Sequence, residues 1–229
     1  ALVATEDSRF YEHDGIDNIS LMRVFVKNLI LQDKSAGGGS TITLQLAKNL
    51  YGRQNYAFFS MLINKFKESI VAQRIEEVYS KDEILTLYLN TVPFSDNTYG
   101  IESASIKFFN KSVQDISIIE AATLVGTLKA NTYYNPRVHL DRSKNRRNVV
   151  LNQMKNYGYL SEDSLAYYSS QDLELEYRSF NHDLGLAPYF RAEVKKQLES
   201  ILDTLKNPEG EDYDLYKDGL IVHTTLDYK

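Results

Sequence analysis

The sequence contains no cysteine, no apolar run long enough for a membrane-spanning helix and no excess of basic residues. Without cysteine the chain has no disulfide, no thiolate metal site and no cysteine nucleophile. The best apolar candidate, Ile116 to Leu128, contains Glu120 and falls short of the roughly 18 residues that a membrane span needs. A formal net charge of −5 argues against a surface that neutralises many nucleic-acid phosphates. We therefore expect no membrane crossing within the chain and no nucleic-acid partner.

Several catalytic signatures are also missing. The histidines have no metal-ligand spacing; they are His13, His139, His182 and His223. The absence of a G-x-S-x-G elbow and of a dinucleotide fingerprint sets aside serine hydrolases and dehydrogenases. The chain has 229 residues, 43% of them hydrophobic, which is enough for a globular core. It begins at Ala1 without an initiator methionine or secretory leader, so we expect an excised domain.

Apolar residues recur at helical spacing along most of the chain. The pattern predicts helices at 19–31, 42–50, 60–75, 80–90, 117–128, 142–157, 161–169 and 188–205. Two of these open with capping boxes, Ser80 with Glu83 and Ser117 with Glu120. Gly219 to Thr225 is typical of a strand. The predicted fold class is mainly α, with a short β segment at the C-terminal end.

The segment T-E-D-S-R-F-Y-E-H-D-G, from Thr5 to Gly15, carries dense polar chemistry. Glu6 and Asp7 lie among charged and aromatic neighbours, namely Arg9, Phe10, Tyr11 and His13. A carboxylate among aromatic side chains can have its pKa raised toward the range of a general base. The same cluster also fits a solvated helix end, and the residues alone leave both interpretations open.

A glycine-rich loop, Lys34 to Ser40, precedes a predicted helix. Four polar residues then recur on one helix face: Thr41, Gln45, Lys48 and Asn49. The free amides of a helix start are a natural seat for a phosphate or diphosphate, with Ser40 and Thr41 as hydroxyl donors and Lys48 as a cation. The loop is not a Walker motif, and a flexible loop before an ordinary amphipathic helix is the alternative.

Lys65 and Glu68 are three residues apart, so both side chains reach one side of a helix. By itself this pair is typical of an exposed ion pair. Combined with Glu6 and Lys48 it supplies two carboxylates and two cations. Transfer of a sugar from a diphosphate needs such a set, because one carboxylate deprotonates the incoming hydroxyl while the cations stabilise the leaving diphosphate.

In this order the segments resemble the family 51 glycosyltransferases, the peptidoglycan polymerase domains of class A penicillin-binding proteins and their monofunctional relatives. The first motif, E-D-x-x-F-x-x-H-x-G, is complete, and the second, G-G-S-T-I-T-Q-Q, departs at Leu44. The third, R-K-x-x-E, has Asn64 in place of arginine, and the fourth has Thr86 where glutamate is common. The framework positions of these motifs and of the fifth, R-R-x-x-V-L, are Phe10, Gly15, Gly38, Gly39, Lys81, Tyr88, Asn90, Arg146 and Arg147.

The resemblance implies a lysozyme-like fold, with residues 1–180 forming the glycosyltransferase domain. Residues 181–229 would extend that domain and begin a linker toward an absent transpeptidase domain. The implied site of action is the outer face of the bacterial cytoplasmic membrane, with a jaw partly embedded in it and an N-terminal anchoring helix absent from this chain. The implied partners are lipid II, the growing lipid-linked glycan strand and other cell-wall synthesis proteins.

By the same resemblance, Glu6 is the general base and Glu68 the second essential carboxylate. Glu68 either orients the leaving group or helps to hold a divalent cation, magnesium or manganese, and no organic cofactor is implied. The substrate- and diphosphate-binding residues implied are Asp7, His13, Ser40, Thr41, Gln45, Lys48, Asn49, Lys65 and Lys129.

Two alternatives remain open at this point. Paired carboxylates also serve a lysozyme-like hydrolase that cleaves finished strands. Asn64 and Leu44, which remove an expected cation and an expected hydrogen-bonding side chain, also fit a non-catalytic lipid II-binding domain.

Overall fold

The computed structural model of the chain describes residues 1–23, 39–55, 59–178, 187–207, 210, 212–215 and 218–226. The chain divides into two compact units, Ala1–Arg178 and Ser179–Lys229, which are described separately below. The first unit carries all five sequence motifs.

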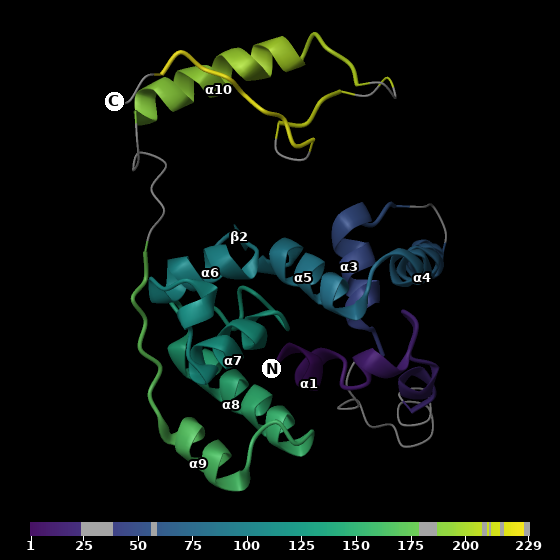
Figure 1. The fold of residues 1–229 in the computed structure, drawn as a ribbon, viewed down its shortest axis with the longest axis vertical. Coiled ribbons are helices and arrows are strands. Elements are labelled where there is room, and N and C mark those ends of the chain that lie inside the picture. The colour runs from purple at the N-terminus through teal and green to yellow at the C-terminus, as the bar shows by residue number, and fades with distance from the viewer. Residues whose placement is uncertain are drawn as a thin grey trace. The chain divides into compact units, whose positions relative to one another are not determined.

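Helices dominate the first unit (Figure 1). They are α1 (Leu2–Glu6), α3 (Ile42–Tyr51), α4 (Ser60–Val78), α5 (Lys81–Thr91), α6 (Ile101–Phe109), α7 (Ile118–Thr127), α8 (Leu140–Asn156) and α9 (Glu162–Ser170). Two 3-10 turns, η1 (Phe10–Glu12) and η2 (Val113–Asp115), lie between them, and residues 18–23 are also helical. The mainly α prediction is confirmed. The remainder of the helix predicted at 19–31 and most of the glycine loop, including Gly38, lie outside the described residues.

Local sequence fixes where three of these helices begin. Ser80 accepts the Glu83 amide and Glu83 reaches back to the Ser80 amide, and Ser117 and Glu120 do the same at α7. Both predicted capping boxes are therefore confirmed. At α3 the Thr41 hydroxyl accepts the amide of Leu44. A side-chain cap of this kind contributes about 0.5–2 kcal/mol, because it satisfies amides that the helix itself leaves unpaired.

The sheet lies at a place that the sequence patterns did not indicate. Strands β1 (Pro93–Phe94) and β2 (Thr98–Tyr99) pair antiparallel, with Phe94 opposite Thr98. Asp96 and Asn97, in the turn between them, both have positive φ. The Asp96 carboxylate accepts hydrogen bonds from Arg137, Asn135 and Tyr177. Strands this short carry no period-2 pattern that the sequence could reveal, and the long-range contacts of Asp96 hold the turn in addition to the strand pairing.

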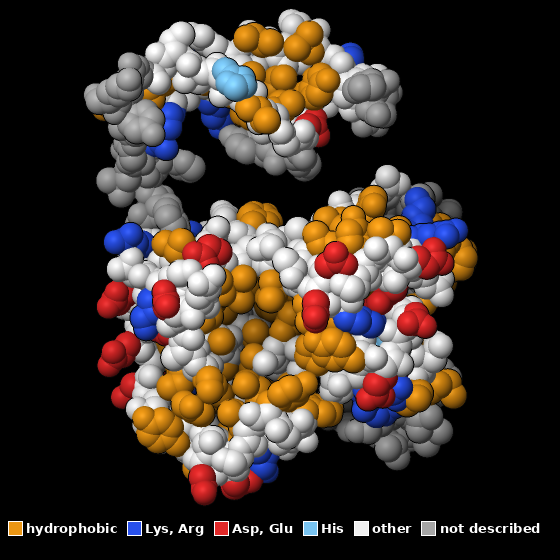
Figure 2. All heavy atoms as spheres, in the orientation of Figure 1, with side chains coloured by type: hydrophobic (Ala, Val, Ile, Leu, Met, Phe, Trp, Pro, Cys, Tyr) orange, Lys and Arg blue, Asp and Glu red, His pale blue; other side chains and the backbone are white. Residues whose placement is uncertain are grey.

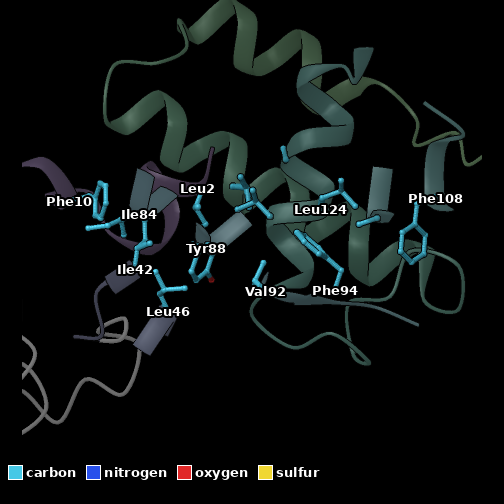
Figure 3. Packing of buried hydrophobic residues seen from close by; sticks show 14 of the residues in the cluster. Leu2, Phe10, Ile42, Leu46, Ile84, Tyr88, Val92, Phe94, Phe108 and Leu124 are labelled. Carbon is cyan, nitrogen blue, oxygen red and sulfur yellow. The ribbon is translucent and has the colours of Figure 1, made fainter. Parts of the chain in front are cut away.

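A band of buried side chains connects these elements (Figure 3). In the close-up, Phe10, Ile42 and Ile84 lie at one end and Phe94 and Phe108 toward the other. Tyr88 of α5 and Val92, which follows the end of that helix, lie between the two groups, so α5 and its C-terminal cap support the middle of the core.

Helix α4 has an inverted distribution of polarity. Its buried face includes Asn64 and Glu68, whereas Leu62, Phe66 and Ile70 are exposed at 66%, 69% and 46%. Spacings of four residues place Leu62, Phe66 and Ile70 along one side of the helix. Apolar side chains also gather on the face shown in Figure 2, over the region of α3, whose last residues Leu50 and Tyr51 are exposed.

The second unit contains α10 (Pro188–Leu202) and one isolated antiparallel bridge between Lys206 and Asp212. The strand predicted at Gly219–Thr225 is wrong, because none of these residues is in a strand. A strand is stabilised by the hydrogen bonds of a neighbouring strand, which a local pattern cannot supply. Among the described residues of the whole chain, no helix is both long enough and apolar enough to cross a bilayer.

Candidate active site

Glu6 is the last residue of α1 and its carboxylate meets the side of α3. The Gln45 amide nitrogen donates to Glu6 Oε2 at 3.1 Å, and the Tyr88 hydroxyl donates to Gln45 Oε1 at 3.0 Å. Burial and then the charge of Glu6 raise the pKa of Tyr88, so this phenol remains a neutral donor. With its oxygen fixed by Tyr88, the Gln45 amide presents its N–H groups to Glu6, and three helices thereby orient one carboxylate.

Asp7, next to Glu6, faces the interior instead. Its carboxylate forms hydrogen bonds with the ring Nε2 of His13 at 3.1 Å and with the backbone N–H of Ile42 at 3.0 Å. Both Asp7 and His13 are buried. In this structure the two residues connect the first motif to the start of α3, and the substrate-binding role predicted for them stays a prediction.

The start of α3 is not an open anion seat. Its first amide already binds Asp7, and the amide of Leu44 binds the Thr41 hydroxyl, which in turn donates to the Gly15 carbonyl at 2.6 Å. Thr41 is 2% exposed, so its hydroxyl is used within the protein. The positive end of the helix has the anion Asp7 as its partner, and a diphosphate contact by this helix start and Thr41 stays a prediction.

Gly15 has to be glycine for this junction to form. Its φ is +85°, and a Cβ there would lie 3.1 Å from the backbone of Ala72 on α4. Any side chain would add both backbone strain and a clash with a helix backbone. The glycine at the end of the first motif thus permits the close approach of Thr41 and α4 to this loop.

Glu68 is held between two cations at the other end of α3. Lys65 Nζ lies 2.8 Å from Glu68 Oε2, and Arg53 Nε donates to Oε1 at 2.8 Å. Burial opposes ionisation of Glu68, but the hydrogen bonds and charges of Arg53 and Lys65 outweigh it and lower the pKa of this carboxyl. The Glu68 side chain is 5% exposed, while those of Arg53 and Lys65 are 43% and 44% exposed. Their remaining N–H groups therefore face solvent.

Lys48 lies between these two ends. It is exposed on α3, one turn after Gln45 and one turn before Gly52, which ends the helix. From Gln45 to Gly52 the helix rises about 10 Å. Among the described residues no carboxylate pairs with Lys48, and Asn49 beside it is also exposed. One helix thus arranges a carboxylate, an exposed lysine and a cationic group in sequence along its length.

The remaining predicted ligands are less closely connected. Lys129 is exposed in the turn after α7, and Ser40 is partly buried just before α3. No hydrogen bond among the described residues joins either side chain to Glu6 or Glu68. A diphosphate contact by Ser40, Asn49 or Lys129 stays a prediction.

The framework residues of the motifs connect helices. Lys81 donates to the carboxylate of Glu76 at 2.8 Å and to the His13 carbonyl, and its ammonium lies 4.5 Å from the centre of the Phe10 ring. Arg147 is fully buried and donates to the carbonyls of Gln171 and Ser169.

Three further framework residues, Gly39, Asn90 and Arg146, lie where neighbouring segments approach each other closely. Gly39 packs against Leu21, Arg146 packs on Gly126, and the Asn90 backbone leaves no room for a Cβ at Gly100.

With Arg53 and Lys65 in place, a divalent cation does not fit at the Glu68 carboxylate. Each carboxylate oxygen has a protein cation 2.8 Å away, and Arg53 or Lys65 would have to leave before a metal could bind. The described residues also contain no group of three or more histidine or carboxylate side chains that could hold a metal ion.

Arg53, which contacts Glu68, is the residue of this group that sequence reasoning missed. It belongs to no motif and stands 15 residues before Glu68 in the chain. The sequence did contain one indication, because Asn64 replaces the arginine of the third motif and a second cation beside Lys65 would then have to come from another segment. Position 64 itself has a different partner, the backbone of Gln54.

Comparison with known proteins places these features in context. A protein-family model described as Transglycosylase matches residues 1–155. Penicillin-binding protein 1F of Bacillus subtilis is 43% identical over 161 residues, covering 70% of this chain and 22% of that protein. Penicillin-binding protein 1A of Escherichia coli is 34% identical over 229 residues, covering 100% of this chain and 25% of that protein. This chain therefore spans about a quarter of the length of these relatives.

Among solved structures, penicillin-binding protein 1A from Haemophilus influenzae aligns with a TM-score of 0.44 at 23% identity. The alignment covers 71% of this chain and 20% of that one.

Proposed function

Because the chain belongs to the transglycosylase family, the family 51 glycosyltransferases, we propose that it polymerises lipid II into β-1,4-linked peptidoglycan strands. One observation carries the proposal beyond family membership. Glu6 and the group formed by Arg53, Lys65 and Glu68 lie toward opposite ends of α3, with Lys48 exposed between them. A base and a cationic group that both contact segments at or next to one helix suit a transfer reaction.

At the base end, Glu6 accepts the proton of the acceptor 4-hydroxyl. The oxygen forms a bond to the anomeric carbon of the donor as the bond from that carbon to the diphosphate breaks, with inversion from α to β. Gln45 supports this step because its N–H group holds the Glu6 carboxylate in place, and Tyr88 prevents the amide from turning over. In this proposal both residues orient Glu6 and neither contacts the substrate.

At the leaving-group end, undecaprenyl diphosphate gains negative charge as the bond breaks. Arg53 and Lys65 present their outward N–H groups, and Lys48 adds a charge nearer the reacting carbon. Glu68 holds the two cations in place before the substrate arrives, so little reorganisation is needed in the transition state. This gives Glu68 an orienting role, and no step passes through a metal.

The exposed face of α4 supports action at a membrane surface, which we propose to be the outer face of the cytoplasmic membrane. Leu62, Phe66 and Ile70 form an apolar stripe on the side opposite Asn64 and Glu68. A helix with this polarity suits an environment in which its outer side meets lipid. The lipid tail of the substrate would then remain in the bilayer while its diphosphate reaches Arg53 and Lys65.

The decisive assay is polymerisation of labelled lipid II by wild type, Glu6→Gln and the control Glu12→Gln. Glu12 is an exposed carboxylate whose side chain pairs with Arg9 instead of Gln45. We expect moenomycin-sensitive polymer from wild type and Glu12→Gln, and a loss of about 10²- to 10⁴-fold in kcat for Glu6→Gln.

Polymer formation that survives Glu6→Gln would refute the assigned base. Release of soluble muropeptides from purified sacculi, without polymer, would favour a hydrolase. Binding of lipid II without turnover would favour a scaffold domain.

A further inference from the structure

Asn64 stands where the third motif has arginine, yet its side chain is buried and specifically bonded. Its amide oxygen accepts the backbone N–H of Gln54 at 3.2 Å, and its amide nitrogen donates to the Gln54 carbonyl at 2.8 Å. A carboxamide supplies both the acceptor and the donor that the backbone N–H and C=O of one residue require. Arginine has donors only, so it could not make this pair.

The pair fixes a stretch of chain that has no regular structure. Gly52 ends α3 with φ of +65°, and residues 52–55 are neither helix nor strand. Hydrogen bonds that hold this stretch to α4 include the two between Asn64 and the Gln54 backbone and the one from Arg53 to Glu68. Because Arg53 and Gln54 are adjacent, the anchor at Gln54 sets where the Arg53 backbone lies.

The result is a cationic group assembled from different elements. Arg53 from the segment after α3 and Lys65 from α4 each lie 2.8 Å from one oxygen of Glu68. The group has a net charge of +1, with the carboxylate buried and both cations nearly half exposed. The arginine of this group stands 11 positions before Asn64, the position at which the third motif has arginine.

We propose that Asn64 is a positioning residue that holds Arg53, through the Gln54 backbone, as the second cation of the diphosphate site. The inference rests on the proposed function, because it assigns Arg53 to the leaving group of that reaction. It also changes the meaning of the departure at Asn64. In this proposal the site still has two cations, because Arg53, in the segment after α3, provides the one that position 64 does not.

A double-mutant cycle tests the inference, using Arg53→Ala, Asn64→Leu, the double variant and the control Arg74→Ala. Arg74 is an exposed arginine of α4 that pairs with Glu77. We expect Arg53→Ala and Asn64→Leu each to lower kcat/KM for lipid II by about 10- to 100-fold. The double variant should be no worse than Arg53→Ala within about twofold, because Asn64 acts through Arg53. Arg74→Ala should match wild type.

Affinity for inorganic pyrophosphate, measured by calorimetry, repeats the cycle without turnover. The same non-additivity in pyrophosphate affinity, with no polymer from wild type, would reject the proposed function while retaining the link between Asn64 and Arg53. A loss from Asn64→Leu that is equally large in the Arg53→Ala background would overturn the link even if wild type polymerises. Wild-type kcat/KM in Asn64→Leu would overturn it as well.

Circular dichroism checks that each variant folds. If Asn64→Leu does not fold, Asn64→Ser takes its place in the cycle, since it also removes the two-point amide pair but adds no bulk. The same two criteria then apply to the serine variant.

Discussion

The Tyr88 hydroxyl is the most remote atom of the support around Glu6, which makes Tyr88→Phe a sensitive test of that support. The change removes one oxygen and retains the ring, which is fully buried in the core. It deletes the donor to Gln45 Oε1 and leaves the hydrogen bond from Gln45 to Glu6 without its anchor.

The expected magnitude follows from these contacts. Loss of one largely buried hydrogen bond, with an acceptor that becomes unpaired, costs about 1–2 kcal/mol of stability. For a chain of this size we expect the melting temperature to fall by about 2–8 °C. Freed from Tyr88, the Gln45 amide can turn its oxygen toward the Glu6 carboxylate. Two facing acceptors would disorder the base, and we expect kcat to fall about tenfold, equivalent to roughly 1.4 kcal/mol.

The assay combines lipid II polymerisation with thermal unfolding. Tyr167→Phe is the matched control, because that tyrosine is 61% exposed on α9. A second comparison uses Gln45→Ala, in which the additional change Tyr88→Phe should lower kcat no further. Wild-type kcat in Tyr88→Phe, despite the expected stability loss, would refute a role for the hydroxyl in orienting Glu6.

Two further outcomes follow from the leaving-group end and from α4. The lowered pKa of Glu68 means that its ion pairs stabilise the fold fully above the ordinary glutamate pKa of about 4.3 and lose this contribution as pH falls through the lower folded-state value. The difference in unfolding free energy between wild type and Glu68→Gln should therefore be constant near neutrality and shrink in acid; a difference that grows in acid would contradict the ion-pair assignment. Replacing Phe66 and Ile70 together by serine should weaken binding to anionic lipid vesicles by at least about tenfold, because each side chain contributes apolar area to the contact. Val149→Ser, at an exposed site on α8, should not change vesicle binding, and equal losses in both variants would argue against a specific membrane face.

Local signals in the sequence determined much of the helical framework. The capping boxes at Ser80 and Ser117 gave the starts of α5 and α7 correctly, because a cap is a contact between residues three apart. The ion pair between Lys65 and Glu68 was also predictable from spacing on one helix. Helix α6 was missed, although Ile101, Ala104 and Phe108 carry its buried spacing.

The resemblance to known glycosyltransferases supplied the family, which comparison with known proteins confirms. It could not say which residues of each motif face the substrate. Asp7, His13 and Thr41 were predicted as ligands, and the structure uses them to close the junction between the first motif and α3. A conserved-looking polar residue has the same appearance in sequence whether its partner is a substrate or the protein's own backbone.

Only the tertiary structure decided the contacts between distant segments. Tyr88 meets Gln45 across 43 positions, Asp7 meets Ile42 across 35, and Arg53 meets Glu68 across 15. Pairs like these depend on how helices pack and on where an irregular segment is anchored, so no local pattern encodes them. The strand predicted at Gly219–Thr225 failed for the same physical reason, because its hydrogen-bonding partner has to come from elsewhere in the fold.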